Sequence, residues 1–512
     1  MKRISPLALL FACFLAFSCG GHEDPVPDES DAPVIVRMDP ENGTAGVTGS
    51  SLSVAFTFDQ NIRCTLEAQK GVSIDGGASV DKVDAYGAVL TVNVSGLGRG
   101  KDYSLTLPAG TVTGYKKNQK GSDAFVFRFS TIDSGQSDWE TAGEAVRNMG
   151  VGWNLGNTLD SNSGNVENMW IEAFTNRTTA DYETAWQQPV TTRELIHMFK
   201  EAGFGAIRVP VTWYPHMGTL TVTVRDDKGY WDKSTWQGYD VDPLWMARVK
   251  EVVDYVMDEG MYCILNVHHD TGDATTAWLK ADKDVHDAVK ERYCALWKQI
   301  ATEFEPYGKR LVFESFNEML DAGNNWNSST HDAHEAINMY NADFVSTVRA
   351  TGGNNAQRNL ILNTYGASPQ EAALADFRLP ADTVEGHLIA EVHSYAPYDF
   401  AFDMSDNPYM KQRTVFDKYC EDEIGRTFEN LNKYLVSKGI PCIMGEYGCT
   451  AIQAETEIAK QAACYISNAS KYDIACFYWM SLSDGEDRSV PKWTRPTLKN
   501  AILNAYNGNK NN

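Results

Sequence analysis

The chain has 512 residues, more than one ordinary hydrophobic core accommodates, so at least two folded units are expected. Hydrophobic residues make up 43% of it, as in globular proteins, and the formal net charge is −23. An acidic surface of this kind repels phosphate backbones, so nucleic acid is not expected as a partner.

The first residues are typical of an export signal. Two basic residues precede an apolar stretch at 7–17, which is too short to span a membrane. The stretch runs into Leu-Ala-Phe-Ser-Cys at 15–19, which resembles a bacterial lipobox. The resemblance implies a lipoprotein signal peptide at 1–18, a lipid on Cys19 and a flexible tether over 19–33. The lipid would hold the protein on the outer membrane. Glu23 and Asp24 after Cys19 resemble export signals that favour the cell surface, and the periplasmic side is the alternative. A plain secretory signal with an incidental Cys19 is the alternative.

Residues 34–132 alternate apolar and polar positions between turn signals, which predicts a small β-sandwich. The clearest predicted strands lie at 53–58, 88–94 and 124–129. The stretch 103–112, closed by 127–131, resembles bacterial Ig-like domains. We expect a spacer, with carbohydrate binding as the alternative, although this region contains no Trp.

From residue 139 to 508 the pattern changes to strand followed by helix, repeated along the chain. This predicts parallel βα units closed into a (β/α)8 TIM barrel, an α/β fold. Eight strands are predicted, at 149–153, 206–211, 263–268, 311–317, 360–364, 388–393, 441–446 and 475–479. Helices are predicted at 192–202, 244–259, 285–304, 334–350, 423–438 and 455–471. The fifth crossover, near 369–377, has the weakest helical pattern.

Polar side chains mark the carboxyl ends of these strands, where barrel enzymes carry their catalytic groups. The predicted site residues are Asn154, Arg208, His268, His269, Asn317, Glu318, His393, Tyr395, Glu446 and Trp479. Two glutamates on different strands of one barrel supply the acid and the nucleophile that cleavage of a glycosidic bond requires.

The ordered motifs resemble glycoside hydrolase family 5, in its branch of endo-β-1,4-glucanases and xyloglucanases. Gly-Trp-Asn-Leu-Gly-Asn-Thr-Leu-Asp at 152–160 and Ile-Arg-Val-Pro-Val-Thr-Trp at 207–213 carry the resemblance. Two departures concern the rim of the cleft. The family usually has Gly after Trp186, where this chain has Gln187, and residues 161–182 form an enlarged first loop.

The resemblance implies a role for each predicted residue. Glu318 would be the acid/base and Glu446 the nucleophile, with Arg208 and Tyr395 donating to Glu446. Asn317 would bind the sugar 2-hydroxyl, His268 and His393 would orient the acid/base, and Trp479 would stack on the sugar. In a retaining enzyme the two carboxyl groups lie about 5–5.5 Å apart.

Other readings of the motifs are weaker. His268 and His269 are neighbours on a predicted strand and should point to opposite faces, so no metal site is expected, and no cofactor is needed. The glycines at 150–156 have the wrong spacing for a dinucleotide-binding loop. Tryptophans that could stack on sugars in the loops are Trp170, Trp186, Trp213, Trp231, Trp236, Trp278 and Trp326. About half of them are expected to pack under loops instead.

The sequence therefore predicts a retaining endo-acting hydrolase of β-1,4-glucan backbones, namely cellulose, mixed-linkage glucan or xyloglucan. Its partners would be a β-glucan polysaccharide or oligosaccharide and the membrane, through the lipid anchor, and we expect a monomer. A β-mannanase of the same fold and a non-catalytic glycan-binding surface protein are the alternatives.

Overall fold

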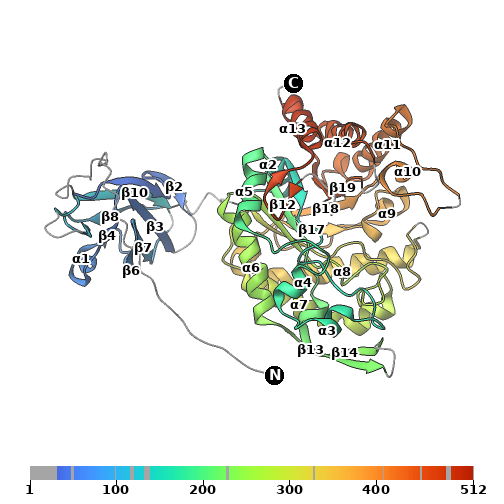
Figure 1. Ribbon diagram of the computed structural model, residues 1–512, viewed down its shortest axis with the longest axis horizontal. Helices are drawn as coiled ribbons and strands as arrows, with labels where there is room; N and C mark the ends of the chain where they lie inside the picture. Colours follow the sequence, from blue (N-terminus) through green and yellow to red (C-terminus); the bar gives the residue numbers. More distant parts are fainter. Residues whose placement is uncertain are drawn as a thin grey trace, which may run out of the picture. The chain divides into compact units, whose positions relative to one another are not determined.

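The computed structural model divides the chain into two units, residues 1–138 and 139–512, each described by itself (Figure 1). The structure describes residues 32–47, 51–98, 100–115, 120–131, 139–225, 230–326, 329–407, 409–449, 453–479 and 486–510. The predicted signal peptide 1–18, the lipid attachment site Cys19 and the tether up to residue 31 lie outside these residues. Among the described helices, none is both long enough and apolar enough to cross a bilayer.

The N-terminal unit is a sandwich of two four-stranded sheets, as its alternating pattern predicts. One sheet has the order β1 (Ile35–Asp39), β3 (Ser51–Phe58), β7 (Val89–Ser95), β6 (Ser79–Tyr86). The other has the order β2 (Thr44–Val47), β10 (Phe125–Thr131), β8 (Asp102–Leu107), β5 (Ser73–Ile74). Short elements complete it: β4 (Ile62–Arg63), β9 (Thr113–Gly114) and α1 (Leu66–Gly71). Every second residue of β7 is buried, so one face of that strand builds the core.

The C-terminal unit contains a closed barrel of eight parallel strands, all of them predicted. They are β11 (Val151–Asn154), β12 (Ala206–Val209), β15 (Tyr262–Asn266), β16 (Leu311–Glu314), β17 (Leu360–Asn363), β18 (Leu388–His393), β19 (Cys442–Tyr447) and β20 (Ala475–Tyr478). Every residue of β16, β18 and β19 is buried, because helices cover the outside and side chains fill the inside. Five strands, β12, β15, β16, β17 and β20, end one to three residues earlier than predicted; β15 stops at Asn266 and β16 at Glu314. The polar residues that follow β15 and β16 lie outside the hydrogen-bonded sheet.

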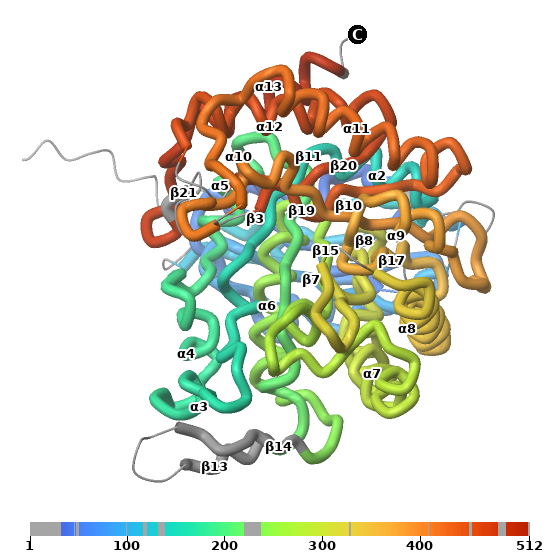
Figure 2. Tube along the Cα trace, turned by 90° about the vertical axis from the view of Figure 1, so that its right-hand side faces the viewer, coloured from blue at the N-terminus to red at the C-terminus, as the bar shows by residue number. Residues whose placement is uncertain are grey.

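Helices pack around the barrel (Figure 2). They include α5 (Arg193–Ala202), α6 (Pro243–Asp258), α7 (Lys283–Glu303), α8 (His331–Ala350), α11 (Lys418–Tyr434) and α12 (Glu455–Ala469), with α2 (Ala142–Met149) and α13 (Pro496–Lys510) at the ends of the unit. The fifth crossover is the short α9 (Glu371–Asp376). Side chains that accept backbone N–H groups begin six of these helices, at Thr141, Thr192, Asp242, Asp282, Thr330 and Asp417.

The enlarged first loop carries two short helices, α3 (Trp170–Phe174) and α4 (Thr179–Glu183). A hairpin that was not predicted, β13 (Met217–Arg225) and β14 (Tyr230–Val241), follows β12. Gly218 allows its strands to approach, since a β-carbon there would lie 2.3 Å from the Gln237 carbonyl oxygen. The remaining short elements are α10 (Tyr398–Ala401), β21 (Glu486–Asp487), β22 (Lys492–Trp493) and 3-10 turns at Tyr214–His216, Gly353–Ala356, Tyr365–Ala367, Val436–Lys438 and Ser470–Tyr472.

Candidate active site

Arg208, on β12, is a fully buried cation at the centre of the barrel's carboxyl end. Its Nη1 donates to Glu446 Oε1 at 2.7 Å and to Asn154 Oδ1 at 2.9 Å. Its Nη2 donates to Asn317 Oδ1 at 2.8 Å. One planar guanidinium therefore ties together three other strand ends, a task that its fixed set of donors suits better than the single ammonium of lysine.

Glu314, which the motifs did not single out, holds the other edge of that guanidinium. Its two carboxylate oxygens accept Arg208 Nε and Nη2, each at 2.7 Å. Burial raises the pKa of Glu314, and Arg208 opposes the rise. Burial also works against the charged form of Arg208, but Glu314, Glu391 and Glu446 hold its pKa well above the usual range. A glutamate inside the apolar run of residues 311–316 was the available sequence signal.

Glu446, on β19, is 4% exposed and accepts a donor at each oxygen. Arg208 donates to Oε1, and the Tyr395 hydroxyl donates to Oε2 at 2.7 Å. Burial raises the pKa of Glu446, while the positive charges of His393 and Arg208 act in the opposite direction. The two donors hold the carboxylate in one orientation and stabilise its ionised form.

Glu318 lies beyond the end of β16 and faces the same space as Glu446. Its Oε1 is 2.9 Å from Nδ1 of His393, and its side chain is 22% exposed. A carboxylate oxygen of Glu318, one of Glu446 and a ring nitrogen of His393 all lie within 4.8 Å of one another. The two predicted glutamates, 128 positions apart in sequence, therefore meet at one point with the short separation of a double-displacement pair.

His393, at the end of β18, pairs in register with Glu446 on β19. Burial disfavours its charged form, but Glu446, Glu318 and Glu391 outweigh burial and raise its pKa to about 10. Its Nδ1 faces both glutamates, at 2.9 Å from Glu318 and 3.6 Å from Glu446, and its Nε2 lies 3.3 Å from Glu391. His393 is therefore a cation near neutral pH. Glu391, inside β18, was not among the predicted residues.

The prediction that His268 and His269 point to opposite faces is wrong. Their rings lie 4.5 Å apart, and both residues line the cleft. The reason is that β15 ends at Asn266, so the alternation of a strand does not apply to them. The ring of His268 lies parallel to that of Trp479, with centroids 5.7 Å apart and an interplanar angle of 5°.

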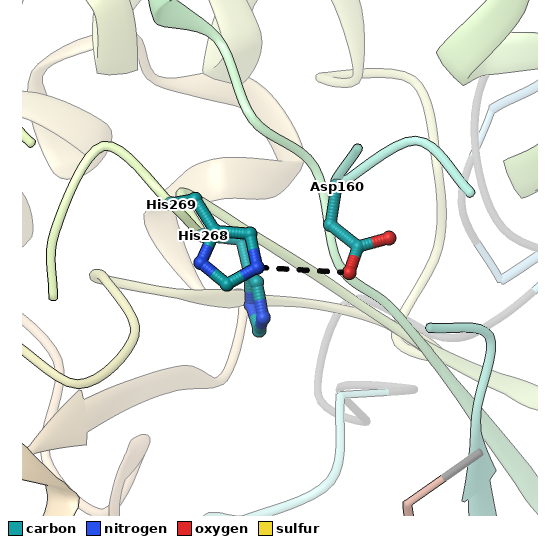
Figure 3. Close-up of side chains that lie close together, drawn as sticks. All are labelled: Asp160, His268 and His269. Atoms are coloured by element: carbon teal, nitrogen blue, oxygen red, sulfur yellow. Dashed lines mark ion pairs between the residues drawn. The ribbon is translucent and has the colours of Figure 1, made fainter. Parts of the chain in front are cut away.

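Asp160, His268 and His269 bring possible metal-ligand atoms within 4.8 Å of one another (Figure 3). Asp160 Oδ2 lies 3.9 Å from His269 Nε2, and burial raises the pKa of Asp160 to about 6. Burial lowers the pKa of His269 to about 4, so that ring is neutral at neutral pH. By charge and residue type alone, these three side chains could bind a metal cation.

The tautomer of His268 argues against a metal at this cluster. Asn266 Oδ1 accepts the Val211 N–H at 3.1 Å, so Nδ2 is the donor that faces Glu314 at 2.9 Å and His268 Nδ1 at 3.0 Å. Nδ1 of His268 therefore accepts, and the ring proton of neutral His268 sits on Nε2. An N–H of this kind donates to a hydroxyl and cannot ligate a metal.

A cleft of about 1110 Å³ opens in front of the paired glutamates. Six of the predicted substrate-binding residues line it, together with both glutamates: His268, His269, Asn317, His393, Tyr395 and Trp479. Asn154 and Arg208 are fully buried instead, and the Asn154 amide donates to the Gly445 carbonyl at 2.9 Å. These two residues fix Glu446 and the backbone next to it, and they do not face the cleft.

The loop tryptophans divide between the cleft and the interior. Trp326 is 43% exposed and lines the cleft, while Trp213 is fully buried. The ring of Trp186 lies 5.3 Å from that of His269, and its Nε1 donates to the Asn162 carbonyl in the enlarged loop at 3.1 Å. Partly buried Trp170 packs against the barrel core, and Trp278 donates to Asp270 at 2.6 Å. The side chains of Trp231 and Trp236 are outside the described set.

Gln187 has φ +65°, in the left-handed region that favours glycine. This is the position where the motif of the resembling family usually has Gly. Gln187 therefore adopts a backbone conformation that a glycine at this position would adopt without strain.

Residues 167–485 match the family described as cellulase (glycosyl hydrolase family 5), and residues 29–131 match the bacterial Ig-like domain family. Endoglucanase A of Clostridium longisporum is 34% identical over 377 residues, which are 72% of this chain and 66% of that protein. Endoglucanase 1 of Ruminococcus albus is 36% identical over 372 residues, covering 70% of this chain and 80% of that protein.

Among solved structures, a family 5 enzyme from Prevotella bryantii B14, crystallised with a xyloglucan tetradecasaccharide, is 41% identical. The match covers 72% of this chain and all of that one, with a TM-score of 0.62. A broad-specificity endoglucanase from Ruminococcus champanellensis with bound cellotriose is 35% identical over 72% of this chain and all of that one, also with a TM-score of 0.62.

Proposed function

This chain belongs to glycosyl hydrolase family 5, and from that premise we propose that it is a retaining endo-acting hydrolase of β-1,4-glucan backbones. One observation carries the proposal: the carboxylates of Glu318 and Glu446 approach within 4.8 Å at the floor of an open cleft. Two carboxyl groups at this short separation favour a covalent glycosyl–enzyme intermediate, because they leave no room for an attacking water beside the sugar ring.

In the first step the Glu446 carboxylate attacks the anomeric carbon, and the bond to the leaving oxygen breaks. The protonated Glu318 gives its proton to that oxygen, so the shortened chain leaves as an alcohol. Asn317 assists, since its Oδ1 is occupied by Arg208 at 2.8 Å and its amide N–H groups are free to donate to the sugar 2-hydroxyl.

In the second step water attacks the anomeric carbon of the glycosyl ester. Glu318, now a carboxylate, takes the proton from this water, and Glu446 leaves as a carboxylate. Two inversions at one carbon restore the original β configuration. Tyr395 and Arg208, each 2.7 Å from a Glu446 oxygen, stabilise the negative charge that Glu446 regains.

The proposed substrates are cellulose, mixed-linkage glucan and xyloglucan. Support comes from the relatives, which are named endoglucanases, and from the similar structures, which hold xyloglucan or cellotriose. The cleft offers Trp479 and Trp326 as flat apolar surfaces for glucose rings.

We also propose that the Ig-like unit is a spacer, that a lipid on Cys19 anchors the chain to the outer membrane at the cell surface, and that the protein is a monomer. The lipobox-like residues at 15–19 support the anchor. Labelling with a radioactive fatty acid in a producing bacterium, beside Cys19→Ala, tests it. Label that persists in the variant would contradict it.

The function is tested by incubating the full chain with a panel of barley glucan, xyloglucan, carboxymethyl-cellulose and β-mannan. Proton NMR recorded during the first turnovers shows the anomer that is released. We expect β products from the glucans and no release from mannan. An α product would exclude the double displacement, and preference for mannan would support the β-mannanase alternative.

A further inference from the structure

Glu391 is a fully buried carboxylate that the proposed reaction does not use. It lies inside β18, two residues before His393, so the two side chains leave the strand on the same side. An unpaired charge in this position would be strongly destabilising, and the barrel supplies cations for it.

Two cations contact this carboxylate through the same oxygen. Glu391 Oε1 lies 3.3 Å from Nε2 of His393 and 3.5 Å from Nε of Arg208. Its Oε2 accepts from Asn363 Nδ2 at 3.3 Å. His393 and Arg208 are also the two cations beside Glu446, at 3.6 Å and 2.7 Å. Glu391 thus sits behind both cations, on the side away from the cleft.

His393 is held between carboxylates on both sides of its ring. Nδ1 faces Glu318 and Glu446, and Nε2 faces Glu391. When Glu318 and Glu446 are both ionised, only the imidazolium has a proton for each of these nitrogens, since the neutral ring would leave one nitrogen lone pair facing a carboxylate. The other charged or titratable groups near His393 and Glu391 are Arg208 on β12, Glu314 on β16, His268 after β15, Tyr395 after β18 and Cys442 on β19.

We propose that Glu391 is a positioning residue for hydrolysis: its carboxylate keeps His393 charged and oriented so that Nδ1–H is presented to Glu318 and Glu446. The proposal rests on the proposed function, because it assigns Glu391 a part in the same site. Glu391 acts through His393 and does not touch the substrate.

The direct test follows the charge of His393 by the NMR shifts of its ring nitrogens in histidine-labelled protein. The chain has 10 His, and His393→Asn identifies the signal. In the unchanged protein we expect imidazolium at about pH 8, where an ordinary His is neutral. In Glu391→Gln we expect the titration to move down by about one pH unit or more. Glu391→Asp keeps the charge and should keep most of the shift.

Glu314→Gln is the matched control, because Glu314 is a buried carboxylate that pairs with Arg208 without a contact to His393. We expect a smaller shift of His393 there than in Glu391→Gln. A neutral His393 at about pH 8 in the unchanged protein would overturn the proposal. So would equal shifts in the two Gln variants. The unchanged protein supplies a result even if a variant does not fold.

Activity gives the second readout. Loss of the negative charge of Glu391 lets His393 release its proton at lower pH, so the alkaline limb of the kcat profile should move down by about one pH unit in Glu391→Gln. An unmoved limb, with His393 shifted, would show that Glu391 charges His393 without serving hydrolysis. Failure of the proposed function itself would appear differently, as absence of hydrolysis in the unchanged protein while the NMR result stands.

Discussion

A β-carbon on Gly445 would lie 1.5 Å from Oε1 of Glu391, so the residue before Glu446 must be glycine for Glu391 to keep its place. The small residue on β19 makes room for a carboxylate from β18. The position of Glu391, the buried carboxylate next to His393, therefore depends on the absence of a side chain at Gly445, the residue before Glu446.

Gly445→Ala should displace Glu391 and lower kcat by at least about tenfold, since the cations beside Glu446 lose a partner. Initial rates on barley glucan measure this. Gly448→Ala is the control, because its added carbon would come no nearer than 3.6 Å to the Tyr478 ring. Equal rates in Gly445→Ala and the unchanged protein would contradict the proposed constraint.

Glu446→Gln and Glu318→Gln should differ in substrate dependence. Glu446→Gln should abolish hydrolysis of every substrate, because no glycosyl ester can form. Glu318→Gln should lose about 10²–10⁴ in kcat/KM on polysaccharide but much less in kcat/KM on a dinitrophenyl cellobioside, because kcat/KM reports the first step and this leaving group needs no proton. The comparison is made by steady-state kinetics on both substrates. The same loss on both substrates in Glu318→Gln would count against its role as the acid.

Arg208→Lys should destabilise the barrel as well as remove activity. The variant loses the two hydrogen bonds to Glu314 and leaves buried carboxylates without enough donors. This costs about 3–5 kcal/mol of unfolding free energy. Urea unfolding measures the change. Arg193→Lys, whose partner Asp258 is 58% exposed, should change stability by less than about 1 kcal/mol. A loss of activity at unchanged stability would contradict the structural part of this expectation.

His393 should add stability that depends on pH. Its pKa rises from 6.5 to about 10 in the folded protein because Glu446, Glu318 and Glu391 outweigh burial. A raised pKa stabilises fully below the unfolded value and is lost as pH increases through the folded value. The unfolding free energy of the unchanged protein relative to His393→Asn should therefore decline between pH 6.5 and about 10. Urea titrations across this window check it, and a constant difference would refute it.

Gln187→Gly should stabilise the protein by about 0.5–1 kcal/mol, because glycine adopts a left-handed conformation without the strain that a side chain imposes. Gln187 has φ +65°. Thermal unfolding measures the gain. Gln188→Gly, at a neighbouring buried position, serves as the control and should lower stability. A lower melting temperature for Gln187→Gly would show that its side chain contributes more than its backbone costs.

Much of the architecture was predictable because strands and helices have short-range periods. All eight barrel strands, the sandwich and the approach of Glu318 to Glu446 follow from residue patterns and strand ends. The hairpin at 217–241 was missed although Leu220, Val222 and Val224 alternate with threonines in β13, because it interrupts the strand–helix repeat on which the barrel prediction relied. The prediction that His268 and His269 point to opposite faces was wrong because β15 ends two residues earlier than predicted. Both residues therefore lie beyond the strand, where side chains do not alternate between faces.

The amino-acid order by itself determined which residues reach the open end of the barrel, since that depends on local alternation and on where each apolar run stops. Only the tertiary structure decided how Glu314, Glu391 and Asn266 are used. These side chains lie inside strands, and their partners are up to 183 positions away, as Arg208 is from Glu391. Closure of the barrel creates a dry interior in which a buried charge is stable only beside an opposite one, and that pairing cannot be read along one strand.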